Sequence, residues 1–374
     1  MLQQIIGTAQ NEYVFLYEWL KKYSGSTIML VCGNSFSNLT ISKYVKKYAT
    51  DMKISVVIFK DFSPNPDYES IEKGVAIFNE NNCAAIIAVG GGSAMDVAKC
   101  IKLYHSMESE ICYLKQEILT NDIEIMAVPT TAGTGSEATK YAVIYYKGEK
   151  QSVVHESCIP QYVLFDPTVL ITLNEHHRKA SMLDALCHAI ESFWSIHSTD
   201  ESMRYSVQAI RMIRENVEGY LQNKSENNQR MMEAAYLAGK AINITQTTAG
   251  HAMCYKLTTL YGIAHGFAAA ICTAYLWQYM IENIAKCTDS RGEEHLRKVF
   301  QEIAKALGDY DMHEAAKMFS QFVKDITGEV AFDNKDLNLV INSANPIRLQ
   351  NNPIKLEKED IKNVYEKIMK YTIE

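Results

Sequence analysis

The chain has 374 residues, enough for two domains of ordinary size, and its composition of 47% apolar and 22% charged residues is typical of a globular protein with a large core. The net charge of −7 argues against nucleic acid or an anionic membrane as a partner. No apolar run approaches the roughly 20 residues needed to span a bilayer, and the first residues lack a signal-peptide pattern, so we expect a cytoplasmic protein. Nine scattered cysteines without a Cys-x-x-Cys pair predict reduced, packed thiols.

The first half of the chain alternates short apolar runs with helical patterns. The runs predict buried strands at 27–33, 53–59, 84–90 and 123–129, and helical periodicity appears between them, as in 67–80. Alternation of this kind is typical of a parallel sheet flanked by helices. We therefore expect an α/β domain here.

The second half has a different character. From about residue 172 the sequence is dominated by long amphipathic helical patterns, as in 184–197, 203–222 and 231–242, and the charged run at 355–367 predicts a solvated terminal helix. We therefore expect an α/β domain over residues 1–166 and an all-helical domain over residues 167–374, divided at an Asp-Pro step.

Two loops that each follow a predicted strand form a candidate phosphate-binding site. The first places Gly90, Gly91 and Gly92 at the start of a helix, where missing side chains let backbone amides approach a pyrophosphate. The second, at 129–137, offers four hydroxyl groups suited to phosphate and ribose, on Thr130, Thr131, Thr134 and Ser136. One glycine turn is weak support because glycines also form plain tight turns. Two such loops on one sheet predict a dinucleotide lying across the strand ends.

Four residues of the second half fit one divalent-metal site. Asp184 and His188 are four positions apart, which puts them on one face of a helix. His251 and His265 add two imidazoles, and one carboxylate with three imidazoles suits Fe²⁺ or Zn²⁺. A lone histidine is more often a core or surface residue than a ligand. The carboxylate on an apolar helical face, however, needs a partner, and a metal supplies one.

Four motifs of the chain together resemble the iron-containing alcohol dehydrogenase family, whose relatives include glycerol dehydrogenase and dehydroquinate synthase. These motifs are GGGSAMDVAK, PTTAGTGSEAT, DALCHAIE and the segment from His251 to HGFAAAI. The resemblance covers nearly the whole chain. It implies a dehydroquinate synthase-like fold, with a Rossmann-like parallel-sheet domain followed by an all-helical metal-binding domain, usually as a homodimer. It also implies NAD(P)-dependent interconversion of a small aldehyde and an alcohol.

The resemblance also assigns roles to individual residues. Carried over by position, the metal ligands are Asp184, His188, His251 and His265. The cofactor contacts carried over in the same way are Gly91, Gly92, Ser93, Asp96, Thr130, Thr131 and Ser136. Fe²⁺ is the expected metal and Zn²⁺ the alternative. The metal then polarises the carbonyl oxygen, while nicotinamide supplies the hydride.

Two neighbouring positions depart from the family pattern and are candidate catalytic residues. Many members carry a second histidine four positions after the ligand that His251 matches, whereas this chain has Tyr255. A phenol with an ordinary pKa near 10 is a poor base, so either the metal tunes Tyr255 or water moves the proton. The next residue is Lys256, where the family often has proline. Either the aliphatic part of its side chain packs against the protein while its ammonium reaches solvent, or the ammonium binds an anionic substrate.

The choice of cofactor depends on the loop after the strand predicted at 27–33. NAD-preferring relatives tend to place an acidic residue there to bind the ribose 2′-hydroxyl, whereas this chain has Gly33, Asn34 and Ser35. No carboxylate repels a 2′-phosphate, so NADP(H) is favoured over NAD(H), although no arginine is evident to bind the phosphate. Gly33 and Ser35 are the candidate contacts.

Residues 251–266 and 345–356 also resemble the branch of the family that reduces phosphonoacetaldehyde to hydroxyethylphosphonate. A dianionic substrate needs cations near the metal, and Lys256, Arg178 and Arg348 are available. Alternatively, Arg178 forms a salt bridge at the start of a helix, and Arg348 is an ordinary surface residue. Three other functions stay open: a generic short-chain alcohol or lactaldehyde-type dehydrogenase, a dehydroquinate synthase-like lyase, and a non-catalytic nucleotide-binding module with a structural metal.

Overall fold

The computed structural model describes residues 4–308, 311–328, 330, 332–333 and 336–370. The chain forms two compact units, Met1–Thr131 with Gly135–Leu173, and Ala132–Thr134 with Asn174–Glu374. The main division thus follows Leu173, and the domain boundary expected at 166–167 stays a prediction.

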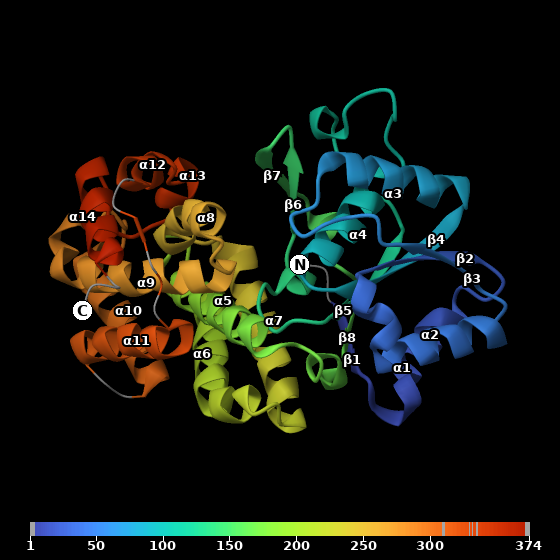
Figure 1. Cartoon of the computed structure of the whole chain (residues 1–374), viewed down its shortest axis with the longest axis horizontal. Coiled ribbons are helices and arrows are strands. Elements are labelled where there is room, and N and C mark those ends of the chain that lie inside the picture. The colour runs from blue at the N-terminus through green and yellow to red at the C-terminus, as the bar shows by residue number, and fades with distance from the viewer. Residues whose placement is uncertain (1–3, 309–310, 329, 331, 334–335, 371–374) are drawn as a thin grey trace. The chain divides into compact units, whose positions relative to one another are not determined.

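A six-stranded parallel sheet forms the centre of the first unit and confirms the predicted α/β class (Figure 1). Its strand order is β1-β8-β5-β4-β2-β3. The four expected runs form the inner and outer strands β2 (Thr27–Cys32), β3 (Ser55–Phe59), β4 (Cys83–Gly90) and β5 (Glu124–Pro129). Two short strands complete the other edge, β1 (Ile5–Thr8) and β8 (Tyr162–Phe165).

Helices cover both faces of this sheet, as a parallel sheet requires. The helices α1 (Gln10–Lys21) and α2 (Thr40–Asp51) lie on one face, and α3 (Tyr68–Glu80) and α4 (Gly92–Tyr104) lie on the other (Figure 1). Ala85 through Val89 of β4 are at most 1% exposed, because this strand is covered from both sides. The continuous apolar run at 84–90 is the sequence signature of that burial.

One element of the first unit departs from the expected alternation. The strands β6 (Tyr141–Tyr146) and β7 (Glu149–Val154) form an antiparallel hairpin that is separate from the main sheet. Lys147 and Gly148 connect them with φ angles of 52° and 79°. Two positive φ values match the twist of a two-residue hairpin turn.

The described residues of the second unit are helical and confirm the predicted all-helical class; their one isolated β pairing joins Cys287 and Ile354. The helices are α5 (Glu175–Trp194), α6 (Asp200–Leu221), α7 (Ser225–Thr245), α8 (Ala249–Tyr261), α9 (His265–Glu282), α10 (Gly292–Leu307), α11 (Met312–Thr327), α12 (Leu337–Asn342), α13 (Pro346–Leu349) and α14 (Lys358–Met369). The helices α5 and α9 lie at the centre, and each is buried along most of its length.

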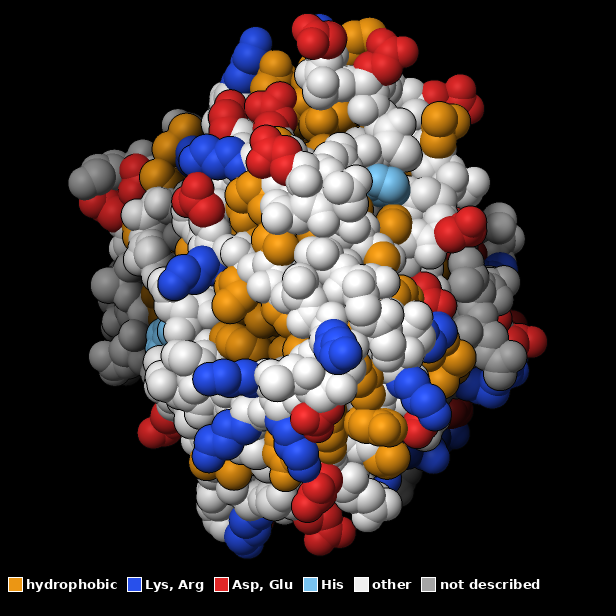
Figure 2. Space-filling view, turned by 90° about the vertical axis from the view of Figure 1, so that its right-hand side faces the viewer, with side chains coloured by type: hydrophobic (Ala, Val, Ile, Leu, Met, Phe, Trp, Pro, Cys, Tyr) orange, Lys and Arg blue, Asp and Glu red, His pale blue; other side chains and the backbone are white. Residues whose placement is uncertain are grey.

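No described helix combines the length and apolar character needed to cross a bilayer. On the face drawn in Figure 2, lysine, arginine, aspartate and glutamate side chains lie scattered among apolar ones.

Candidate functional site

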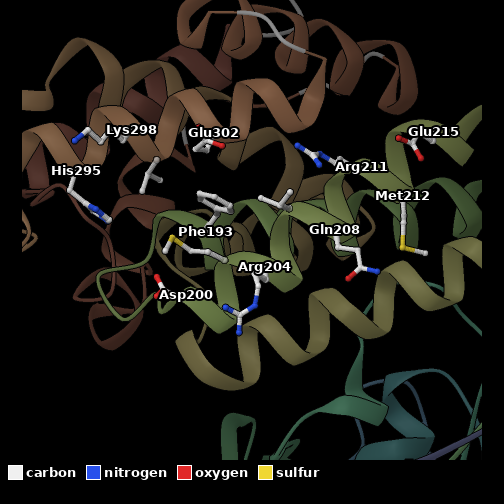
Figure 3. A pocket seen from close by; sticks show the side chains of 13 residues that line it. Phe193, Asp200, Arg204, Gln208, Arg211, Met212, Glu215, His295, Lys298 and Glu302 are labelled. Carbon is white, nitrogen blue, oxygen red and sulfur yellow. The ribbon is translucent and has the colours of Figure 1, made fainter.

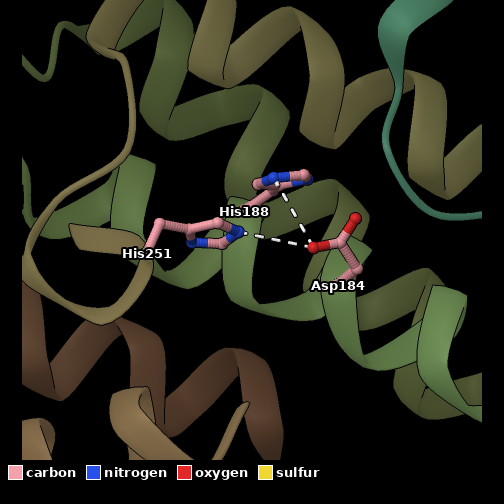
Figure 4. A group of neighbouring side chains, drawn as sticks. All are labelled: Asp184, His188 and His251. Atoms are coloured by element: carbon pink, nitrogen blue, oxygen red, sulfur yellow. Dashed lines mark hydrogen bonds and ion pairs between the residues drawn. The ribbon is translucent and has the colours of Figure 1, made fainter. Parts of the chain in front are cut away.

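The helical unit brings three predicted metal ligands together inside its core. Asp184 and His188 lie on adjacent turns of α5, and His251 lies in the first turn of α8 (Figure 4). One potential ligand atom from each lies within 4.8 Å of the other two. Their side chains are only 6%, 9% and 2% exposed. A carboxylate buried to this degree requires compensation by positive charge or hydrogen bonds.

The fourth predicted ligand, His265, lies beside this group at the start of α9. Its Nε2 is 3.8 Å from Asp184 Oδ1, the same distance as His188 Nε2, while His251 Nε2 is 3.4 Å away. Three imidazoles therefore approach one carboxylate oxygen. The His265 side chain is 41% exposed, in contrast to the other three. The cluster is thus enclosed on most sides and open on the side of His265.

The protonation states show an excess of negative charge in this cluster. Burial alone would lower the pKa of His251, but the carboxylates of Glu191 and Asp184 raise it to about 9. Burial lowers the pKa of His188 to about 4, so this imidazole is neutral and can offer a lone pair at neutral pH. A divalent cation among these side chains would balance the carboxylates and use the neutral imidazole, so the donor set fits Fe²⁺ or Zn²⁺.

Glu191 is a further part of the cluster that the sequence analysis does not identify. His251 Nδ1 and Glu191 Oε1 are 2.6 Å apart. The same carboxylate accepts hydrogen bonds from the backbone amide and hydroxyl of Thr248 and from the Thr273 hydroxyl. These contacts hold the imidazole with Nε2 toward Asp184. A carboxylate on the far nitrogen is the usual support of a metal-binding histidine.

The two candidate catalytic residues of α8 lie differently. The Tyr255 ring stacks on the His265 ring, with centroids 5.7 Å apart and an interplanar angle of 14°. Burial raises the pKa of Tyr255 above its ordinary range, so the phenol keeps its proton. Lys256 is five residues after His251, which is about 140° around the helix axis. Its ammonium makes no hydrogen bond or ion pair to a described residue, so the structure brings Tyr255 to the cluster but not Lys256.

The two arginines considered for an anionic substrate also differ. The Arg178 guanidinium is buried and donates to Tyr220 O, Asn228 Oδ1 and Asn223 Oδ1. These bonds tie α5 to the end of α6 and the start of α7, which is a structural role. Arg348 lies 5.5 Å from the centroid of the Tyr255 ring, on the open side of the cluster.

In the α/β unit, the predicted nucleotide loops meet at the carboxyl ends of neighbouring strands. Gly90 is paired with Pro129, and Thr130 donates its amide to Gly90 O at 2.9 Å. Gly33 follows β2, the strand on the other side of β4. The carboxyl ends of adjacent parallel strands are the usual place for a dinucleotide.

The glycines of the first loop have a steric reason. Gly91 is the N-cap of α4 and makes no side-chain capping bond, and a Cβ at Gly90 would lie 2.5 Å from the Ala94 Cβ. Gly92 begins α4, and Ser93 follows in its first turn, where Ser93 Oγ accepts the Asn65 amide at 3.3 Å. A helix start without a side-chain cap can accept a phosphate, so this loop fits a pyrophosphate.

Side chains of α4 are hydrogen-bonded to the end of the second loop. Ser136 Oγ donates to Asp96 Oδ1 at 3.0 Å, and Lys99 Nζ contacts Ser136 O at 2.6 Å and Tyr141 O at 2.7 Å. The Lys99 side chain is fully buried, and burial lowers its pKa. Lys99 therefore fixes the end of this loop, a role that the sequence motif alone does not reveal.

The remaining predicted cofactor residues are less tightly grouped. Thr130 and Thr131 follow β5 directly, whereas Thr134 belongs to the short segment Ala132–Thr134 that clusters with the helical unit. Ser35 is exposed in the turn after Gly33, and no Asp or Glu occurs between Gly33 and Thr40.

A broad groove elsewhere in the helical unit contains none of the predicted site residues. It runs between α6 and α10 and is lined by charged side chains such as Arg204, Arg211 and Lys298 around an apolar floor that includes Phe193 (Figure 3). The candidate metal centre is therefore defined by its buried side chains and not by this groove.

Comparisons with known proteins follow the same division of the chain. A family described as iron-containing alcohol dehydrogenase matches residues 8–167, and the C-terminal part of the Fe-containing alcohol dehydrogenase family matches residues 179–369. Phosphonoacetaldehyde reductase of Streptomyces viridochromogenes is 30% identical over 291 residues, which cover 74% of this chain and 73% of that protein. 1,3-Propanediol dehydrogenase of Klebsiella pneumoniae is 33% identical over 249 residues, 65% of this chain and 64% of the relative.

A solved structure shares the fold over its whole length. Sulfoacetaldehyde reductase from Bifidobacterium kashiwanohense, in complex with NAD⁺, superimposes with a TM-score of 0.84 at 24% identity and covers 99% of this chain and 98% of its own. The matches to both halves of the chain, which contain the cluster of Asp184 with three histidines, show that the protein belongs to the iron-containing alcohol dehydrogenase family and is an oxidoreductase.

Proposed function

We propose that Asp184, His188, His251 and His265 hold one Fe²⁺ ion and that the protein uses it in the nicotinamide-dependent reduction of a small aldehyde to a primary alcohol. The buried Asp184 carboxylate, with three imidazole nitrogens within 3.8 Å, carries this proposal. One carboxylate and three imidazoles form a borderline donor set that Fe²⁺ and Zn²⁺ both accept, and the family favours iron. A bound ion of this kind supplies Lewis-acid polarisation of a carbonyl oxygen.

The side chains of this chain have distinct tasks in that reaction. Glu191 holds the imidazole of His251 and keeps the Nε2 lone pair toward Asp184. Tyr255 keeps its phenolic proton because burial raises its pKa, so it suits a proton donor to a developing alcohol and not a base. Among the four proposed ligands His265 is the most exposed, so we propose that substrate approaches the cluster from its side.

For the cofactor, we propose that the loops after β2, β4 and β5 hold NADP(H) at least as well as NAD(H). The backbone amides at Gly91 and Gly92 would bind the pyrophosphate, and the Thr131 side chain lies beside Gly91. Thr130 follows β5 directly, and the Ser136 hydroxyl donates to Asp96 in α4. The loop at Gly33 and Ser35 carries no acidic residue to repel a 2′-phosphate. Introducing one by Gly33→Asp is expected to shift the ratio of kcat/KM values toward NADH.

As substrate we propose a short aldehyde with an anionic group, of which phosphonoacetaldehyde is the first candidate. The relative whose printed name is phosphonoacetaldehyde reductase matches 74% of this chain. A generic short-chain aldehyde is the second candidate, because a relative named 1,3-propanediol dehydrogenase is 33% identical.

The test is a turnover assay on the purified, iron-loaded protein. Oxidation of NADPH and NADH is followed with phosphonoacetaldehyde, lactaldehyde and propanal, and metal content is measured on the same samples. We expect turnover with at least one aldehyde, loss of turnover after chelation, and recovery with Fe²⁺. A His251→Ala variant should lose both metal and turnover; full activity with stoichiometric metal in that variant would reject the site.

A further inference from the structure

The open side of the metal cluster carries one cation in a defined position. Arg348 lies on the short helix α13, where its backbone amide donates to the Asn345 side chain at 3.1 Å. Asn345 in turn donates its own amide to Ala252 O in α8 at 3.1 Å. The segment that carries Arg348 is therefore fixed to the same helix that carries His251 and Tyr255.

The Arg348 side chain is also fixed. Its Nη1 donates to the Thr247 hydroxyl, and the guanidinium lies 5.5 Å from the centroid of the Tyr255 ring. The Asn351 side chain donates to Thr247 O at 3.0 Å and holds this loop from the other side. When one nitrogen is hydrogen-bonded and the guanidinium lies near an aromatic ring, the remaining N–H groups keep a fixed orientation.

The Arg348 guanidinium has no carboxylate partner among the described residues. Over the described part of the chain, no Asp or Glu oxygen lies within 4.0 Å of the Arg348 guanidinium, and its one side-chain hydrogen bond is to a neutral hydroxyl. Arg291, by contrast, forms an ion pair with Asp289 at 2.6 Å. A partly buried arginine with N–H groups left over after its one hydrogen bond can bind an anion through a charge-assisted, bidentate contact.

Its position relates it directly to the metal cluster. Arg348 contacts Tyr255, Tyr255 stacks on His265, and His265 lies 3.8 Å from Asp184. Among the four predicted ligands, His265 is the most exposed, so the path from solvent to the cluster passes this side.

We propose that Arg348 binds the anionic end of a short aldehyde substrate whose carbonyl group lies at the metal cluster, and so selects phosphonate, sulfonate or carboxylate aldehydes over neutral ones. This inference rests on the proposed aldehyde reductase function. It assigns the selectivity to Arg348 and not to Lys256, which lies on another face of α8, or to Arg178, whose donors are occupied by backbone and amide oxygens. The planar guanidinium also matches the oxygens of a phosphonate or carboxylate in a bidentate geometry.

The test compares Arg348→Gln, Arg348→Lys and the parent, all iron-loaded, with phosphonoacetaldehyde and with propanal. In Arg348→Gln we expect the KM for phosphonoacetaldehyde to rise about ten- to a hundredfold, as for loss of a hydrogen bond to a charged group, while kinetics with propanal change less than about twofold. Arg348→Lys keeps the charge without the fork and should recover part of the loss. Arg297→Gln, which removes an exposed arginine of α10, is the matched control and should behave as the parent.

Binding of the product analogue 2-hydroxyethylphosphonate, measured by calorimetry without turnover, gives a second readout. It should weaken in Arg348→Gln and stay unchanged in Arg297→Gln. An equal loss for both aldehydes, or a selective loss in Lys256→Gln instead, would overturn the role of Arg348 but leave the reductase function intact. If no aldehyde is turned over, the proposed function fails, and the calorimetric comparison alone decides whether Arg348 forms an anion site. If Arg348→Gln does not fold, the lysine variant decides in the same two assays.

Discussion

Glu191 shows how a single residue organises the candidate metal centre. Its two oxygens accept hydrogen bonds from the His251 imidazole, from the Thr248 amide and hydroxyl, and from the Thr273 hydroxyl. No part of the Glu191 side chain is exposed. The hydrogen bonds and the ion pair with His251 outweigh burial, which would raise the pKa of the carboxyl, and keep it ionised. The sequence does contain a signal, since Asp184, His188 and Glu191 share one helical face. Chain spacing alone, however, does not reveal that Glu191 meets His251, 60 residues later.

The first prediction concerns this support. Glu191→Gln keeps the shape of the side chain but removes the charge that orients His251, so we expect metal affinity to fall about ten- to a hundredfold. The measurement is a competition titration with a metal-binding dye. Glu175→Gln, at the exposed start of the same helix, is the control and should bind metal like the parent. Equal affinity in both variants would show that Glu191 only fills space.

A second buried carboxyl predicts a pH effect in the α/β unit. Burial raises the pKa of Glu137 from its ordinary value of 4.5 to about 7. Because the folded state then binds the proton more tightly than the unfolded state, the free energy of unfolding should fall as the pH rises from about 4.5 to about 7 and level off above. Such a change in pKa corresponds to at most about 3–4 kcal/mol in the free energy of unfolding.

Glu137→Gln removes this titration, so its unfolding midpoint in urea should exceed that of the parent at pH 8 and approach it at pH 4.5. The exposed Glu156, which pairs with Lys140 at 3.1 Å, provides the control variant Glu156→Gln. If the difference between the urea midpoints of the parent and Glu137→Gln stays constant from pH 4.5 to pH 8, Glu137 ionises with an ordinary pKa.

At the scale of elements, the strands were predictable where burial is complete. The continuous apolar runs at 84–90 and 123–129 correspond to β4 and β5 within one residue, because both faces of these strands are covered. The short edge strand β1 and the hairpin strand β7 carry exposed or partly exposed side chains, so no continuous apolar run marks them. The contact of α13 with Tyr255 was also beyond prediction, since it depends on how a segment 93 residues further along the chain returns to α8.

The close approach of α9 to α5 gives a prediction at this scale. A Cβ at Gly266 would lie 1.9 Å from the backbone oxygen of Ala180 and 3.0 Å from the Asp184 Cβ. Gly266→Ala must therefore push His265 away from Asp184, and overpacking of this kind costs about 1–3 kcal/mol. We expect a lower melting temperature together with less bound iron.

The control is Gly33→Ala, where an added Cβ meets nothing within 4 Å and φ is −80°. Its melting temperature should match that of the parent. A Gly266→Ala protein with normal stability and full iron content would show that the two helices can separate without disturbing the ligands.

At the scale of the whole molecule, the metal should act as a stabilising ligand. Asp184, His188 and Glu191 come from α5, His251 from α8 and His265 from α9, so a bound ion links three helices of the same unit. A ligand that binds only the folded state stabilises it by about 2.7 kcal/mol at a hundredfold excess over its dissociation constant. Chelation should therefore lower the melting temperature of the iron-loaded parent by several degrees.

His251→Ala should show no such response to a chelator, because it lacks a complete ligand set. Differential scanning calorimetry with and without chelator makes the comparison. A chelator effect of equal size in the variant would place the stabilising metal elsewhere in the protein.

The pairing of β1 with β8 affects the order in which the sheet can form while the chain is synthesised. Ile5 pairs with Tyr162 and Thr8 with Phe165, so the first strand of the chain has its sheet partner more than 150 residues away. At a synthesis rate of about 5–20 residues per second, the ribosome needs on the order of ten to thirty seconds to complete that partner. During this interval Ile5 and Ile6 have no strand beside them, while β2, β3 and β4 can already pair with one another. The sheet can thus begin to form at its β3 edge during translation, and we expect the residues made first to be among the last to join it.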